Sequence, residues 1–127
     1  MAERARPEIE LRDLSDAQTI TVVHVNTQAE YDKLTRIFEC GGWTWIMGER
    51  ATTKPELYQR YKEKTYLQAQ DGFQYGSMND DWMKEDYNHD AIVKKRRVIS
   101  LEQFIKEQRL TPEQIRDIEG HFRDNPQ

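Results

Sequence analysis

The alternation of apolar and polar residues predicts a strand and then a helix in the first part of the chain. Residues Thr19–Val25 form a short, mostly β-branched run, which is typical of a strand. Thr27 and Glu30 have the spacing of a helix capping box, and Gly41 stands where a left-handed C-terminal cap is expected. Between them, apolar residues recur at helical spacing at Tyr31, Leu34, Ile37 and Phe38.

A second strand is predicted over residues 43–47, where Trp43, Trp45 and Met47 alternate onto one face. Because this run follows a helix with a strong apolar stripe, core packing explains the two tryptophans better than a ligand pocket does. Residues 49–62 have a weaker pattern, in which residues 51–55 are loop-like and residues 56–62 allow a short turn of helix.

The clearest β-hairpin signal lies further along the chain. Residues 65–70 and 73–77 are strand-like, and Asp71 and Gly72 between them suit a two-residue turn. A fifth strand with a charged middle is predicted over residues 91–99.

Two helices are predicted at the end of the chain. Ser100 with Gln103 caps the first, and Thr111 with Gln114 caps the second, in which Pro112 takes the first helical position. The apolar stripe of the second consists of Ile115, Ile118 and Phe122.

These elements predict an α+β fold. We expect a small, mostly antiparallel sheet of about five strands, with one N-proximal helix and two C-terminal helices packed on it. Residues 1–17 are charged and lack periodicity, so they are expected to form a flexible arm; residues 18–123 would form one domain, and residues 124–127 a frayed tail.

Composition narrows the classes of function. The chain of 127 residues has a net charge of -4 and a charged fraction of 33%. An acidic balance speaks against broad nucleic-acid binding, which needs a basic face. The sequence has no apolar run long enough for a signal peptide or a membrane span, and it has a single cysteine, Cys40. These features favour the cytoplasm.

The acidic segment over residues 78–90 is the leading candidate for a contact surface. It combines carboxylates, which would steer the chain toward a basic surface, with apolar side chains that interfaces favour as anchors. The alternatives are a solvated loop or a cation site, although no central glycine of an EF-hand is present. The predicted partner-binding residues are Asp80, Asp81, Trp82, Met83, Glu85, Asp86 and Tyr87.

The basic run Lys94, Lys95, Arg96 and Arg97 suggests an alternative, contact with nucleic-acid phosphates. If the run is a strand, alternate side chains point to opposite faces and do not form one patch. Charges of this kind also protect an edge strand from pairing with another chain.

Catalytic and metal signals are weak. His24, His89 and His121 have no helical i, i+4 partner, and Cys40 has no second cysteine near it, so we expect no metal site. The sequence shows neither a glycine-rich phosphate loop nor a nucleophile with its base. We therefore expect no enzyme activity and no cofactor.

Several short motifs resemble a group of small proteins encoded by bacteriophages and prophages. The motifs lie at Val23–Val25, Thr27–Tyr31, Gly42–Trp45, Tyr61–Thr65, Tyr75–Ser77 and Val98–Phe104. The resemblance covers roughly residues 20–106; the N-terminal arm and the last helix depart from it. It implies a phage accessory protein that binds a host protein, and inhibitors of bacterial defence systems are one such class.

The leading functional hypothesis is therefore a non-enzymatic phage accessory protein that binds and inhibits or redirects a bacterial host protein, such as a defence-system component. Two alternatives remain. One is a nucleic-acid-associated module that uses the basic run, and the other is a small-ligand binder with a pocket near Trp43, Trp45 and Tyr75. The chain is expected to be a monomer or a homodimer in the host cytoplasm.

Overall fold

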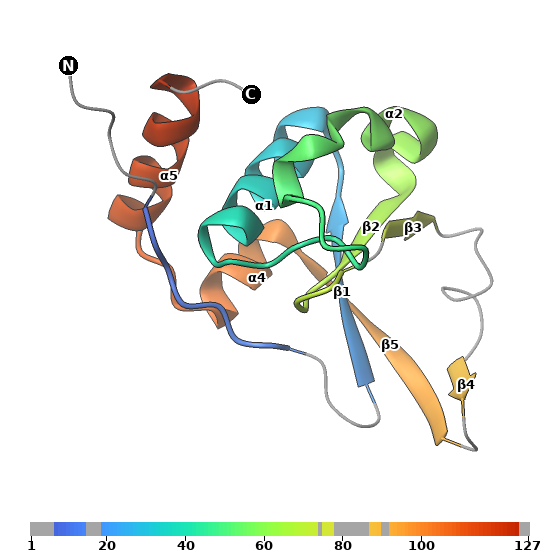
Figure 1. Cartoon of the computed structure of the whole chain (residues 1–127). Coiled ribbons are helices and arrows are strands. Elements are labelled where there is room, and N and C mark those ends of the chain that lie inside the picture. The colour runs from blue at the N-terminus through green and yellow to red at the C-terminus, as the bar shows by residue number, and fades with distance from the viewer. Residues whose placement is uncertain (1–6, 15–18, 74, 78–86, 90–91, 125–127) are drawn as a thin grey trace.

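The computed structural model describes residues 7–14, 19–73, 75–77, 87–89 and 92–124 (Figure 1). The strands are β1 (Thr19–Val25), β2 (Thr65–Gln68), β3 (Tyr75–Ser77), β4 (Tyr87–His89) and β5 (Ile92–Ser100). The α-helices are α1 (Gln28–Cys40), α2 (Tyr58–Tyr61), α4 (Leu101–Glu107) and α5 (Pro112–Asp124). Short 3-10 turns occupy Ala51–Thr53, Pro55–Leu57 and Lys62–Lys64.

Strand β1 is the centre of the sheet, whose order is β3-β2-β1-β5-β4. It pairs antiparallel with β2 and parallel with β5, with Val22 opposite Val98 in the parallel ladder. Because β1 has a neighbour on each side, five of its seven residues are buried. The long, apolar β1 therefore forms the base on which the helices pack.

The fold-class prediction is wrong in the number of strands and helices. Within the described ranges, three strands of four residues or more, β2-β1-β5, form the sheet, and β3 and β4 add only three residues each at its edges. The same ranges contain four α-helices rather than three. The additional helix, α2, forms where the Tyr58 ring is buried and its hydroxyl donates to the Asn26 carbonyl oxygen at 2.6 Å.

The strand predicted over residues 43–47 is also wrong. Only isolated bridges occur there, from Thr44 to Arg50 and from Trp45 to Phe73. The Gly48 N–H donates to the Trp45 carbonyl at 2.7 Å and turns the chain back. The alternation fails at its last member, because Trp43 and Trp45 are buried whereas Met47 is 82% exposed.

The hairpin is wider than the two-residue turn predicted at Asp71-Gly72. The strands pair from Thr65 with Ser77 to Leu67 with Tyr75, so the connection begins before Asp71 and ends after Phe73. Phe73 is fully buried, and the Asp71 carboxylate accepts from the Thr44 N–H at 3.0 Å. These two contacts draw the connection toward the core. Strand β4 likewise occupies part of the segment expected to be a loop.

The helix caps agree with the sequence. The side-chain oxygens of Thr27, Ser100 and Thr111 accept from the N–H groups three residues on, at 3.0, 3.0 and 3.1 Å. At the other end of α1, however, Gly41 has a φ of -85°, and Gly42 takes the left-handed conformation at +80°.

The main core lies between the sheet and the helices. The helices α1, α4 and α5 gather on one side of β1 and β5 (Figure 1), and Phe38, Phe73 and Phe104 pack at its centre. A smaller cluster of Ile20, Val22 and Tyr66 lies apart from it. Since successive residues of a strand face opposite ways, this cluster belongs to the other face of the sheet.

Residues 7–14 were expected to be part of a flexible arm, but they pack along the domain. The partly buried side chains of Ile9, Leu11 and Leu14 contact the main core. The Leu14 N–H donates to the Ala69 carbonyl at 3.3 Å. Every second or third residue of this segment is apolar, and this spacing lets an extended chain bury one side against the domain.

Candidate functional site

Most of the predicted partner-binding residues, from Asp80 to Asp86, lie outside the described residues. Tyr87 begins β4, where its backbone pairs with Lys94 of β5, but its side chain is not described. The contact surface predicted at these positions therefore stays a prediction.

The basic run lies in β5, and the side chain of its last residue is already engaged. Arg97 Nη1 and Nη2 donate to the two carboxylate oxygens of Glu107, at 3.0 and 2.7 Å, and Nε donates to Thr21 Oγ1 at 3.2 Å. Hydrogen bonds from Arg97 and Gln103 hold the pKa of Glu107 below its ordinary value. Arg97 thus serves the packing of α4 against the sheet. The side chains of Lys94, Lys95 and Arg96 are not described.

The clearest exposed apolar group lies on the loop of residues 44–50, here called the Ile46–Met47 loop. Ile46 is 57% exposed and Met47 is 82% exposed, at the tip of a turn between two anchored ends. Gly48 has a φ of +87°, which residues with a side chain rarely adopt. This conformation allows the chain to turn tightly after Met47. Together the two side chains form a small exposed apolar patch, which a protein contact could include as part of a larger surface.

Both ends of the Ile46–Met47 loop are anchored to the domain. The Trp45 ring is buried against Phe73, with ring centroids 4.3 Å apart, and its Nε1 donates to the Ala51 carbonyl at 3.2 Å. The Ile46 N–H donates to the Phe73 carbonyl at 3.1 Å. The turn is therefore fixed directly beneath its exposed tip.

The far end of the loop is held by a buried carboxylate. Glu39 of α1 is only 3% exposed, and it accepts from Arg50 Nη2 at 2.9 Å and from Thr52 Oγ1 at 2.7 Å. Burial raises the pKa of Glu39, but the hydrogen bonds from Arg50 and Thr52 outweigh burial and leave the pKa below its ordinary value. Glu39 is therefore a charged anchor that ties the loop to the end of α1.

A groove of about 300 Å³ runs beside the tip. Its apolar lining includes Trp45, Leu57 and Phe73, together with Ile46 and Met47 themselves. At its rim the ammonium of Lys54 lies 2.9 Å from a Glu49 carboxylate oxygen and 5.7 Å from the centre of the Trp45 ring. The rim charges neutralise each other, so the groove suits an apolar side chain of a partner. Trp45, one member of the predicted small-ligand pocket, lines it.

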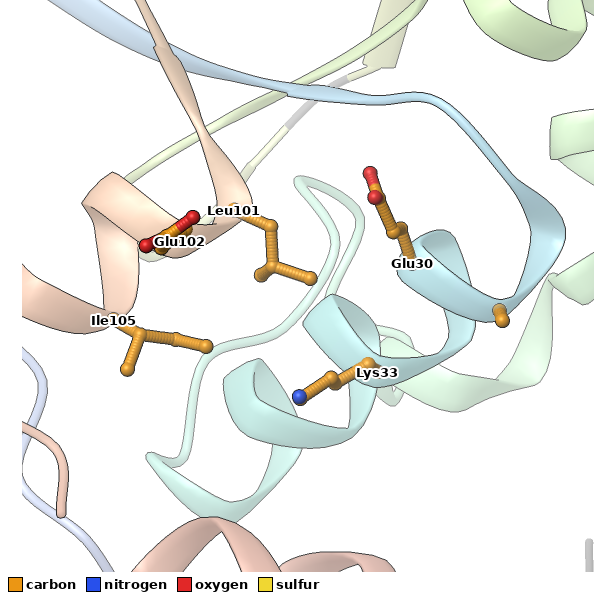
Figure 2. A pocket seen from close by; sticks show the side chains of 6 residues that line it. Glu30, Lys33, Leu101, Glu102 and Ile105 are labelled. Atoms are coloured by element: carbon orange, nitrogen blue, oxygen red, sulfur yellow. The ribbon is translucent and has the colours of Figure 1, made fainter. Parts of the chain in front are cut away.

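A second hollow, of about 330 Å³, lies between α1 and α4. Figure 2 shows Leu101 and Ile105 of α4 pointing toward α1, with Lys33 opposite them and Glu30 and Glu102 at the edge. The Glu30 carboxylate already accepts from the Asn26 N–H at 2.9 Å as part of the α1 cap. These lining residues bring together no nucleophile and base, so the hollow is a surface depression with a small apolar floor.

The other candidate side chains have structural surroundings. The His24 ring stacks on Tyr66 at 4.8 Å and is hydrogen-bonded to the Glu63 carbonyl oxygen, while His121 packs edge-on against Phe122. Cys40 is buried. Among the described residues, no group of three His, Cys, Asp or Glu side chains is arranged to hold a metal ion.

None of the helices in the described part of the chain is long and apolar enough to cross a lipid bilayer. Comparison with protein-family models, with characterised proteins and with solved structures finds no match to this chain. The functional argument therefore depends on the chain's own residues.

Sequence reasoning missed the Ile46–Met47 loop because it assigned the loop to a strand. The run does contain a usable signal, since Trp45 is followed by Ile46 and Met47 and then by Gly48. In these four residues a buried aromatic anchor is followed by two exposed apolar residues and a turn glycine. The sequence alone does not show that the Trp45 ring is buried while Ile46 and Met47 are exposed.

Proposed function

We propose that this chain is a non-enzymatic protein that acts by binding another protein, and that the Ile46–Met47 loop is part of its contact surface. The observation that carries the proposal is the exposure of Ile46 and Met47 on a turn whose neighbours Trp45 and Arg50 are fixed to the domain. The predicted acidic segment from Asp80 to Tyr87 would supply a second, charged part of the same function.

Three physical properties support this use of the loop. Burying Ile46 and Met47 in an interface removes apolar surface from water. The anchored turn loses little conformational freedom on binding, so less of the interaction energy is lost to ordering. The unbranched methionine side chain adapts to partners of different shape. A tip of this kind inserts its side chains into a partner, while the groove beside it accepts one in return.

The resemblance to bacteriophage proteins favours a bacterial host protein as the partner, for example a component of a defence system. We propose that the chain acts in the host cytoplasm and blocks or redirects its partner by occupying a surface. The net charge of -4 would speed encounter with a basic partner surface.

The experiment compares capture of bacterial proteins by the tagged chain and its variants. Ile46→Ser with Met47→Ser removes the apolar tip, and Val98→Ser, at a residue that is 50% exposed elsewhere, is the matched control. We expect a stoichiometric partner that is retained by the native chain and by Val98→Ser and is lost by the double variant. Equal capture by all three chains would show that the loop is not the contact.

The acidic segment is tested in the same assay with Trp82→Ala and Tyr87→Ala. Loss of the partner in this variant as well would assign both regions to one contact surface. Loss only in the Trp82 and Tyr87 variant would move the contact to the segment that the sequence predicts.

A further inference from the structure

Strand β5 is longer than either of the strands beside it. On one side it pairs with β1 through residues 95–100, and on the other side it pairs with β4 through residues 92–94. Figure 1 shows β5 continuing past β4 toward α4. No strand in the described part of the chain pairs with the side of residues 95–100 that faces away from β1, which is here called the β5 edge.

The β5 edge has the length and the backbone groups of a strand-pairing site. An extended stretch of this size spans about 20 Å, which is the length of a typical strand. Alternate residues of a strand direct their N–H and C=O groups to opposite sides, so half of these residues direct them away from β1. Such a row of donors and acceptors is the template to which an extended peptide adds as a further strand.

The exposure of Val98 shows that the β5 edge reaches solvent. Val22 of β1 lies opposite Val98 in the parallel ladder, so both side chains lie on the face of the sheet that is turned away from the main core. Val22 is fully buried, whereas Val98 is 50% exposed. The apolar cluster around Val22 therefore continues to Val98 and ends there. A strand added at the β5 edge would place a side chain beside Val98 and extend this cluster.

The opposite face of β5 is held in place by Arg97. Its guanidinium is bonded to the Glu107 carboxylate of α4 and to Thr21 Oγ1 of β1. These bonds tie β5 to its neighbours on the side of the helices. The β5 edge is therefore ordered before any partner arrives, and an added strand need only order itself.

Charge selects the kind of strand that suits the β5 edge. The basic run occupies residues 94–97 of this strand. Two copies of the chain paired through their β5 edges would bring two basic runs into one short ladder, which like-charge repulsion opposes. The same charges attract a strand that carries carboxylates.

We propose that the β5 edge binds an extended segment of a partner protein in which acidic residues alternate with apolar ones. The backbone of the segment pairs with residues 95–100, and one of its apolar side chains lies beside Val98. This contact is separate from the Ile46–Met47 loop and does not depend on it.

Binding of designed peptides tests the proposal. The probe is a fluorescent peptide with blocked ends that alternates glutamate and valine, and anisotropy measures its binding to the native chain. One control peptide has lysine in place of glutamate. The other has a methyl group on every backbone nitrogen, which removes the donors of both strand edges. We expect one probe per chain and about tenfold weaker binding of either control.

Variants of the chain locate the contact. Val98→Asp places a carboxylate at the β5 edge, where it repels the glutamates, and should weaken binding of the probe about tenfold. Circular dichroism checks that this variant folds. Val98→Ser keeps the backbone that supplies most of the affinity in strand addition, so it should weaken binding only slightly. Ile46→Ser with Met47→Ser should bind the probe as the native chain does.

Amide hydrogen exchange gives a second readout on the native chain. In residues 95–100 the N–H groups that face β1 should be protected, and the alternate ones should exchange fast until the probe protects them. Protection of all these amides before the probe is added would overturn the proposal, because the edge would already be paired. No binding of the probe, or equal binding of the probe and both controls, would overturn it as well.

Discussion

The guanidinium of Arg50 lies against the carboxylate of Glu39, with Arg50 Nη2 2.9 Å from Glu39 Oε2 and Arg50 Nε 3.3 Å from Glu39 Oε1. The two residues join the end of α1 to the end of the Ile46–Met47 loop. Arg50 is the exposed member, and Glu39 is the buried one. The pair therefore couples the loop to the stability of the core.

This pair predicts a stability that depends on pH. Since hydrogen bonds from Arg50 and Thr52 outweigh burial and lower the folded-state pKa of Glu39 below 4.5, ionised Glu39 stabilises the fold above that pH. The contribution is lost as the pH falls through the lower folded-state value. Glu39→Gln should reduce the free energy of unfolding at neutral pH by about 1–3 kcal/mol. Its loss of stability in acid should be shallower than that of the native chain.

Urea unfolding at a series of pH values measures both effects. Glu56→Gln removes the same charge at an exposed residue and controls for the change in net charge. An equally steep loss of stability in acid for Glu39→Gln and the native chain would contradict the assignment of Glu39.

Gly41 and Leu11 are predicted to be coupled. Gly41→Ala places a methyl group on Leu11 and should destabilise the fold by about 1–3 kcal/mol, as overpacking does. Leu11→Ala removes the atoms in conflict, so the double variant should cost less than the sum of the two single changes. A double-mutant cycle by thermal or urea unfolding measures this coupling. Strict additivity would mean that the two residues do not touch in solution.

Arg97 is predicted to stabilise the fold modestly and not to bind nucleic acid. Its side chain is 43% exposed, so solvent screens the pair with Glu107, and Arg97→Gln should cost only about 0.2–1 kcal/mol, less at high salt. Unfolding at low and high salt measures this cost. Arg97→Lys, which keeps the charge but loses the fork geometry, is the control. A gel-shift assay at low salt in which Arg97→Gln weakens binding to DNA or RNA would favour the nucleic-acid alternative instead.

Variants of the Ile46–Met47 loop are predicted to lose partner binding while keeping the stability of the fold. Ile46→Ser with Met47→Ser should change the free energy of unfolding by about 0.5 kcal/mol, because more than half of each side chain is exposed. Trp45→Ala should cost about 3–5 kcal/mol, since the ring is part of the core. A large loss of stability in the serine variant, seen by urea unfolding, would mean that the two side chains are packed in solution.

The features that sequence predicted well depend on residues close together in the chain. The caps at Thr27, Ser100 and Thr111 each need a partner only three residues away, so the local pattern contains the whole interaction. The strand over Thr19–Val25 could also be predicted locally, because its β-branched, apolar composition matches its burial in the structure.

The features that sequence did not predict depend on distant residues. Residues 43–47 do not form a strand, because the Trp45 ring packs in the core against Phe73. A glycine is needed at position 41 because Leu11 occupies the space of a side chain there, and not because the residue caps the helix. Ile46 and Met47 have the same apolar character as the core residues beside them. Their exposure follows from the anchoring of Trp45 and Arg50, which no local pattern reports.

The parallel ladder between β1 and β5 has a consequence for the order in which this chain is made. Thr21 and Arg97 lie on these two neighbouring strands but are 76 residues apart in the sequence. During synthesis the central strand emerges early, and its second edge stays open until β5 follows. A nascent chain paused between Leu67 and Val98 would carry an open strand edge, and chaperones bind polypeptides in such a state. Translation speed across this interval would therefore influence the yield of folded protein.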